Sequence, residues 1–239
     1  TSSCPAPLTT CITSAPTSVV AGQAFSLTIE FRDASGNRAA DSDRALVVSG
    51  EGGELRALTA NSAVAIISNV VLTEASAAST ITVRATDLGV EDTTDIAVTP
   101  GPASRLTLTG PASAVAGTAF SVTVSARDQY DNVAPDYRGV VRFTSNDPST
   151  APNPILPGNY TFTDTDLGSH TFAAGVTLYT SSVTPMRVTV TDLTPIAAPS
   201  ATLDVVIGGG PATRIALTGP SSATAGAPFE VTATVYDSN

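Results

Sequence analysis

A nine-residue segment occurs three times in this chain, and this internal repeat limits the possible folds more than any other feature. The copies read Val-Ala-Gly-Gln-Ala-Phe-Ser-Leu-Thr at 20–28, Val-Ala-Gly-Thr-Ala-Phe-Ser-Val-Thr at 115–123 and Thr-Ala-Gly-Ala-Pro-Phe-Glu-Val-Thr at 224–232. The glycines of the first two copies lie 95 positions apart, and those of the next two lie 109 apart. A period of about 100 residues is too long for a solenoid unit and suits a string of β-sandwiches.

The second copy shows the two-residue alternation of half-buried strands. In 120–127, Phe, Val, Val and Ala alternate with Ser, Thr and Ser, so one face is apolar and the other polar. The strands expected in this copy are 105–109 (a first edge strand), 120–127, 140–144, 160–162, 170–178, 186–191 and 202–207. About seven strands at this length are typical of an immunoglobulin-like (Ig-like) sandwich. We therefore predict an all-β chain of tandem Ig-like β-sandwiches of about seven strands each, with the third repeat incomplete.

Proline- and glycine-rich segments divide the repeats. They occur at 99–102 and 208–211, and such segments mark linkers. The expected organisation is an N-terminal segment at 1–16, a first Ig-like domain at 17–100, a second at 101–208 and the start of a third repeat at 209–239. A lone pair of strands is marginal in water, so we favour continuation of the chain beyond Asn239; pairing of these strands with another subunit is the alternative.

Several segments of the second copy carry a resemblance to a known family. They are Asp128-Gln129-Tyr130-Asp131-Asn132-Val133-Ala134, followed by 137–148, 156–163, 166–172, 175–178 and 188–192. This copy resembles bacterial Ig-like repeats of the invasin/intimin-related and large surface-adhesin type, whose turn reads Asp-x-x-Gly-Asn followed by Pro and Val. The resemblance spans nearly all of 103–207, and the first copy departs from it around 50–54. It implies a location and a class of role, and it names no ligand.

Two cysteines, Cys4 and Cys11, lie near the N-terminus. Our leading interpretation is a local Cys4–Cys11 disulfide formed in an oxidising compartment; intermolecular pairing remains the alternative. A zinc site is not favoured, because two cysteines and the single distant His170 do not provide four ligands. No repeat contains both a tryptophan and a cysteine pair, so the antibody-type core is excluded.

Charge and hydropathy exclude several classes of partner. The chain has no lysine, eleven arginines and 21 acidic residues, for a net charge of −10. This charge would repel phosphate backbones and anionic lipid surfaces, so no nucleic acid is expected as a partner. No run approaches the roughly 20 apolar residues of a membrane-spanning helix, so no membrane insertion is expected in this segment.

Few residues could support catalysis. His170 is the single histidine, and the sequence has neither a Gly-x-Ser-x-Gly elbow nor a Gly-x-Gly-x-x-Gly loop. We interpret His170 as an ordinary residue at the edge of a strand and predict no enzymatic activity. The tyrosines, including Tyr130 at a turn, are scattered, so sugar binding stays an open alternative that no residue pattern supports.

Carboxylates are the remaining candidates for chemistry. Calcium prefers clustered oxygen ligands, so Asp128, Asp131 and Asn132 form a candidate calcium site at a domain junction. The favoured interpretation is a turn in which Asp and Asn bond the local backbone. The segment 164–168 also carries carboxylates at alternate positions but lacks a third acidic ligand and a distal Glu; a tight turn is favoured there as well. No other cofactor is expected.

The resemblance, the repeats and the acidity together favour a non-catalytic structural or adhesive protein outside the bacterial cell. Its tandem modules would form a stalk or array, with other copies of itself, other cell-surface proteins or glycans as partners. One alternative is a subunit of a self-assembling extracellular filament or sheath joined by β-strand complementation. Another is a set of accessory modules, carbohydrate-binding ones included, of a larger secreted enzyme.

Overall fold

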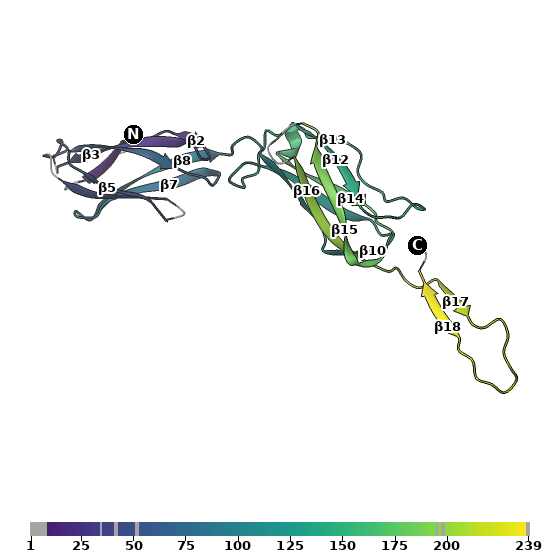
Figure 1. Cartoon of the computed structure of the whole chain (residues 1–239). Helices are drawn as coiled ribbons and strands as arrows, with labels where there is room; N and C mark the ends of the chain where they lie inside the picture. Colours follow the sequence, from purple (N-terminus) through teal and green to yellow (C-terminus); the bar gives the residue numbers. More distant parts are fainter. Residues whose placement is uncertain are drawn as a thin grey trace. The chain divides into compact units, whose positions relative to one another are not determined.

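The computed structural model describes residues 9–33, 35–40, 43–50, 53–194, 196 and 199–237. In these residues the chain is almost entirely β-strand and turn (Figure 1). It divides into two compact units, one made of Thr1–Gly101 with Asp128–Asn132, the other of Pro102–Arg127 with Val133–Asn239. Among the described residues the single helix is the 3-10 turn η1 (Asp164–Asp166), and no helix there is long and apolar enough to cross a membrane.

The first unit contains one β-sandwich built from two sheets. One sheet has the strand order β1-β3-β6, and the other has the order β2-β8-β7-β4-β5. The strands are β1 (Thr9–Ser14), β2 (Ser18–Val20), β3 (Ala24–Arg32), β4 (Arg44–Gly50), β5 (Gly53–Ala60), β6 (Val64–Val71), β7 (Ser76–Ala85) and β8 (Val90–Thr99). Strand β1, which lies in the segment expected to precede this sandwich, pairs antiparallel with β3.

The second unit repeats this arrangement. One sheet has the order β14-β11-β9 and the other the order β10-β16-β15-β12-β13. The strands are β9 (Arg105–Thr109), β10 (Ser113–Val115), β11 (Phe120–Arg127), β12 (Val140–Ser145), β13 (Tyr160–Thr161), β14 (Ser169–Val176), β15 (Ser182–Asp192) and β16 (Ser200–Gly208). Two further strands, β17 (Arg214–Thr218) and β18 (Thr232–Tyr236), form a separate antiparallel pair.

The first strand of each sandwich changes sheet at a proline. β9 pairs antiparallel with β11, and after Gly110-Pro111 the chain re-enters as β10, parallel to β16. β1 and β2 divide in the same way around Pro16, with β2 parallel to β8. Proline has no N–H to donate, so it interrupts the ladder at that point. Counted as one split strand, β9 and β10 bring the sandwich to seven strands, which confirms the predicted all-β Ig-like class.

Alternating side chains fill the core of each sandwich. Phe120, Val122, Val124 and Ala126 of β11 are all buried, as the alternation predicted. The core of the second sandwich also holds aromatic pairs in edge-to-face contact, such as Phe143–Phe172 at 4.9 Å between ring centroids. Each fully buried Val, Leu, Ile or Phe contributes about 1.5–3 kcal/mol. Edge-to-face packing of Phe and Tyr rings fills space in a core that has no tryptophan.

The predicted strands of the second sandwich are all present, with differences at their ends. The bounds of β9 and β11 agree with the prediction, β14 ends at Val176 rather than 178, and β15 begins at Ser182 rather than 186. The prediction missed β10. In β14 the register shifts against β11, and Ala174 has a φ of +49°. This bulge ends the regular pairing before the apolar pattern ends.

Candidate functional site

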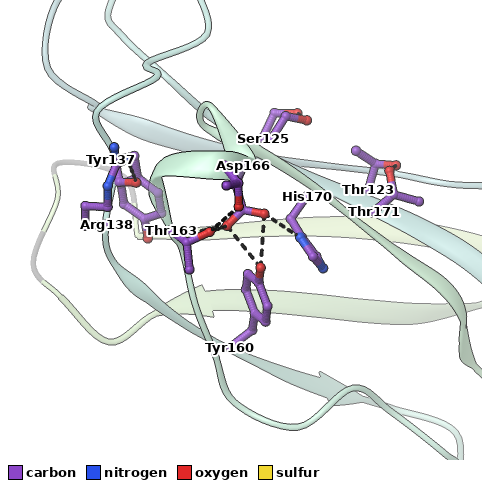
Figure 2. A network of polar contacts seen from close by, with 11 residues as sticks. Thr123, Ser125, Tyr137, Arg138, Tyr160, Thr163, Asp166, His170 and Thr171 are labelled. Carbon is purple, nitrogen blue, oxygen red and sulfur yellow. Dashed lines mark hydrogen bonds and ion pairs between the residues drawn. The ribbon is translucent and has the colours of Figure 1, made fainter.

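A cluster of polar side chains surrounds Asp166 in the second sandwich (Figure 2). Asp166 ends the η1 turn, Tyr160 comes from β13, and His170 comes from β14. The turn closes through Leu167 and Gly168, with φ values of +48° and +80°. A Cβ on Gly168 would lie 2.2 Å from the carbonyl oxygen of Ala134, so only glycine fits there. The tight turn predicted over 164–168 is confirmed.

The Asp166 carboxylate accepts hydrogen bonds on both oxygens. The backbone N–H of Thr163 donates to Oδ2 at 2.7 Å, and the Thr163 hydroxyl donates to the same oxygen at 2.9 Å. The Tyr160 hydroxyl lies 3.0 Å from each oxygen, and His170 Nδ1 lies 2.7 Å from Oδ1. The Asp166 side chain is only 7% exposed. Its acceptor capacity is therefore used within the protein.

These contacts set the protonation state of the cluster. Burial raises the pKa of Asp166, but hydrogen bonds from the Thr163 backbone, from His170, and from the Thr163 and Tyr160 hydroxyls lower it more, to about 2. Burial, together with the neighbouring Asp166 carboxylate, raises the pKa of Tyr160. Asp166 is thus a carboxylate at every physiological pH, which suits a hydrogen-bond acceptor and not a general acid.

The His170 ring packs against neighbouring aromatic rings. Its ring stacks on Tyr160 at 4.0 Å between centroids and meets Phe172 edge-on at 4.7 Å. The nearby hydroxyls of β11 and β14 pair with each other, Ser125 with Ser169 and Thr123 with Thr171. In the described part of the chain, no hydrogen bond joins His170 to a serine or threonine hydroxyl. His170 is the second residue of β14, and its ring contributes to the packing at that end of the strand.

Asp128, the first residue of the acidic turn after β11, is 1% exposed. Its Oδ1 accepts the backbone N–H groups of Tyr130 and Asn132 at 2.8 and 2.9 Å. Its Oδ2 accepts the backbone N–H of Gly101 at 2.8 Å and the side-chain Nδ2–H of Asn132 at 2.9 Å. Burial raises the pKa of Asp128, and these hydrogen bonds outweigh burial and leave the pKa below its ordinary value. The carboxylate therefore caps backbone, as the turn interpretation predicted.

The bond from the linker glycine to this aspartate recurs in the third repeat. Gly101 N donates to Asp128 Oδ2 at 2.8 Å, and Gly210 N donates to Asp237 Oδ2 at 2.7 Å; in both cases the partners are 27 residues apart. We call this bond the linker lock. Sequence reasoning found the glycine and the aspartate as separate turn signals and missed that they bind each other. Their constant spacing in both copies was the available signal.

The other two residues of the candidate calcium site have different surroundings. Asp131 is exposed and has a left-handed φ of +75°, and the Asn132 amide donates to Asp128. Among the described residues, no three His, Cys, Asp or Glu side chains gather as metal ligands would. A calcium ion at Asp128, Asp131 and Asn132 would have to compete with four N–H donors for Asp128. Calcium at this junction stays a prediction.

One of the two cysteines of the expected disulfide lies outside the described residues. Cys4 lies outside the described residues, and Cys11 is in β1, where it pairs with Glu30 of β3. The structure of the described residues gives the Cys4–Cys11 bond no support, and the bond stays a prediction.

Comparison by sequence finds no relative. No family model matches the chain, and no curated protein matches it.

Solved structures resemble the chain only in fold. A putative membrane anchored protein from Corynebacterium diphtheriae is 15% identical, over 89% of this chain and 56% of that one, with a TM-score of 0.36. Invasin, a bacterial integrin-binding protein, is 18% identical over 90% of this chain and 42% of its own, with a TM-score of 0.35. Fibronectin(III)-like modules of Clostridium thermocellum CbhA are 13% identical over 84% and 94%, with a TM-score of 0.26. The chain spans about half the length of the first two, and its function has to be inferred from its own residues.

Replacement of Asp166 should destabilise the second sandwich in a pH-dependent way. Because its pKa is lowered to about 2 from an ordinary 3.8, the ionised carboxylate stabilises the fold above about pH 4, and this contribution is lost as pH falls through about 2. Asp166→Asn should lower the free energy of unfolding by about 2 kcal/mol at pH 7, and the difference from the wild type should shrink between pH 4 and 2. Urea unfolding across this range measures it.

Asp164→Asn is the matched control for this variant. Its carboxylate is 91% exposed and pairs with Arg138 at the surface, so it should change stability by less than about 1 kcal/mol. Equal effects of the two replacements would contradict the assignment of the cluster to Asp166.

Loss of the linker lock should also be measurable. Asp128→Ala leaves the N–H groups of Gly101, Tyr130 and Asn132 without their acceptor, so the free energy of unfolding should fall by roughly 2–3 kcal/mol. Asp136→Ala, at an exposed position beyond the same turn, should be within about 0.5 kcal/mol of the wild type. Denaturant titration of both variants provides the comparison, and an Asp128→Ala protein as stable as the control would rule out the capping role.

Proposed function

We propose that this chain is a non-catalytic structural or adhesive protein of the bacterial surface. Its tandem Ig-like modules form an extracellular stalk or array that holds a binding surface away from the cell. Other copies of the chain, other cell-surface proteins or glycans are its partners. Two features support the proposal: the repeated local structure of the modules, and the carboxylates that accept backbone N–H groups within the loops.

One observation carries this proposal: the third copy repeats the local structure of the second. β17 pairs with β18 so that Arg214 lies opposite Tyr236 and Thr218 opposite Thr232. In the second copy, Arg105 lies opposite Arg127 and Thr109 opposite Thr123, which is the same register 109 positions earlier. The linker lock recurs with it. A chain in which the first paired strands of successive modules form with the same register is suited to an arrangement of modules in series.

The buried carboxylates support a structural role. Asp128 and Asp147 are buried, the Asp166 side chain is only 7% exposed, and all three accept backbone N–H groups. Burial raises the pKa of Asp147, but hydrogen bonds from Thr180, Tyr179 and Ser149 outweigh burial and leave the pKa below its ordinary value. Ionised acceptors of this kind hold loops in place, and proton transfer at neutral pH requires pKa values nearer to 7.

A stalk must resist extension, and force spectroscopy tests this. Stretching one chain between its ends should give two successive unfolding peaks, one for each sandwich. Each should lengthen the chain by on the order of 30 nm, because about 100 residues extend by roughly 3.3–3.6 Å each. Extension without force peaks, or one event for the whole chain, would contradict a series of independent load-resisting modules.

The β17–β18 pair favours a second candidate function, a subunit of an extracellular filament joined by β-strand complementation. Its apolar residues Ile215, Leu217 and Val235 are exposed, and a two-stranded ribbon alone is marginal in water. A neighbouring subunit that covers this ribbon would join copies in a chain.

Deletion of 211–239 tests the filament. If copies join through the ribbon, the shortened chain should form no polymers in electron micrographs, while its circular dichroism and melting remain those of two folded sandwiches. Val235→Lys in the full chain, which places a charge on the apolar face, should have the same effect. Polymers that form unchanged from both variants would exclude this route of assembly.

A further inference from the structure

One asparagine of the second sandwich lies in a sequence pattern that glycosyltransferases recognise. Asn159-Tyr160-Thr161 reads Asn-x-Thr with a residue other than proline in the middle, and it is the single Asn-x-Ser/Thr segment of the sequence. This pattern is the acceptor for N-linked glycosylation. A pattern of three residues also arises by chance, so its structural surroundings decide whether it can be used.

The structure holds this segment in place and leaves its two reactive positions at the surface. Asn159 and Thr161 are exposed, and Tyr160 between them is half-buried. Tyr160 anchors the segment, because its hydroxyl bonds to Asp166 and its ring stacks on His170. The asparagine and the threonine of the pattern are therefore both accessible from solvent.

The Asn159 amide is also free to react. The side-chain amides of Asn37, Asn132 and Asn146 take part in hydrogen bonds that hold loops. In the part of the chain that the structure describes, no hydrogen bond joins the Asn159 side chain to another residue. A bonded amide would have to give up its partners before it could meet a sugar donor. Asn159 reaches a transferase without that cost.

The position of the segment in the sheet gives a glycan a physical role. β13 is the outer strand of its sheet and pairs with β12 only at Val140 and Val141, whereas the corresponding strand β4 pairs with β5 along the whole of Arg44–Gly50. Continued by one step, the β12–β13 register places Asn159 opposite Arg142. A bulky, hydrated glycan there would lie beside the part of the β12 edge that β13 leaves unpaired and hinder the addition of a further strand.

From these observations we propose that Asn159 is the acceptor of an N-linked glycan. The Asn159 Nδ2 atom forms a bond to the anomeric carbon of a glycosyl diphosphate. The bond from that carbon to the diphosphate oxygen breaks, the diphosphate leaves with the electron pair, and the amide loses one proton. A lipid-linked oligosaccharide and a nucleotide sugar are the two donors with this chemistry. The modification depends on neither the stalk nor the filament function, since it requires only that the chain meets a transferase.

Mass spectrometry of the protein purified from its natural source tests the proposal. Trypsin cleaves after Arg142 and Arg187, so residues 143–187 form one peptide that contains both Asn153 and Asn159. We expect this peptide to carry an added sugar mass, and its fragment ions to place that mass on Asn159. A block of several sugars indicates the lipid-linked donor, and a single sugar indicates the nucleotide-linked donor.

Matched variants expressed in the same source test the pattern itself. Asn159→Gln and Thr161→Ala should lose the added mass completely, whereas Thr161→Ser should keep it because serine preserves the pattern. Asn153→Gln is the control: Asn153 is exposed in the same loop, but Pro154 follows it and the pattern is absent. This control should keep the glycan. Circular dichroism should show the same fold for all four variants.

Two results would overturn the proposal: an unmodified Asn159 in the natural protein, or a glycan on Asn159 that persists in the Thr161→Ala variant. Neither result would alter the force-extension measurement on the two sandwiches. Failure of this modification and failure of the stalk function can therefore be told apart.

Discussion

Each pair of strands in this chain has one apolar face, and covering that face is the constraint on which the rest of the structure depends. Val122 and Val124 of β11 reach full burial because β14 lies at one edge and the sheet of β15 and β16 lies opposite. The proline-directed change of sheet between β9 and β10 ties the two sheets together at the first strand. Burial of apolar area is the main favourable term in folding, so the loops and caps only have to hold this arrangement in register.

Aspartate side chains hold these loops in place. Asp147 joins the loop after β12 to the loop after β14, since its carboxylate accepts Ser149 N at 3.0 Å and Tyr179 N at 2.7 Å. Asp128 and Asp166 act in the same way in two other loops. Each carboxylate loses hydrogen bonds to water on burial, and several charge-assisted hydrogen bonds from fixed donors replace them. An acidic chain can thus place ionised carboxylates against its loops as acceptors of backbone N–H groups.

The sequence predicted those parts of the fold that depend on local alternation. The strand Phe120–Arg127 has a strict apolar–polar period and was predicted with its correct bounds. Ser113–Val115 was not, because three residues are too few to show a period and their pairing with β16 is parallel and distant in sequence. The linker lock was also missed, although its spacing of 27 residues occurs in both copies. Gly101 and Asp128 each indicate a turn, but only the folded path of β9 and β11 brings them within 2.8 Å.

One outer strand of each sandwich carries a bulge. β6 and β14 are the outer strands beside β3 and β11, and each contains a left-handed residue, Asn69 or Ala174, at a shift in register. Bulges of this kind bend an edge and prevent further strands from adding to it. In both sandwiches the bulge therefore ends the three-stranded sheet at the same position relative to the repeated segment, so each module protects this edge in the same way.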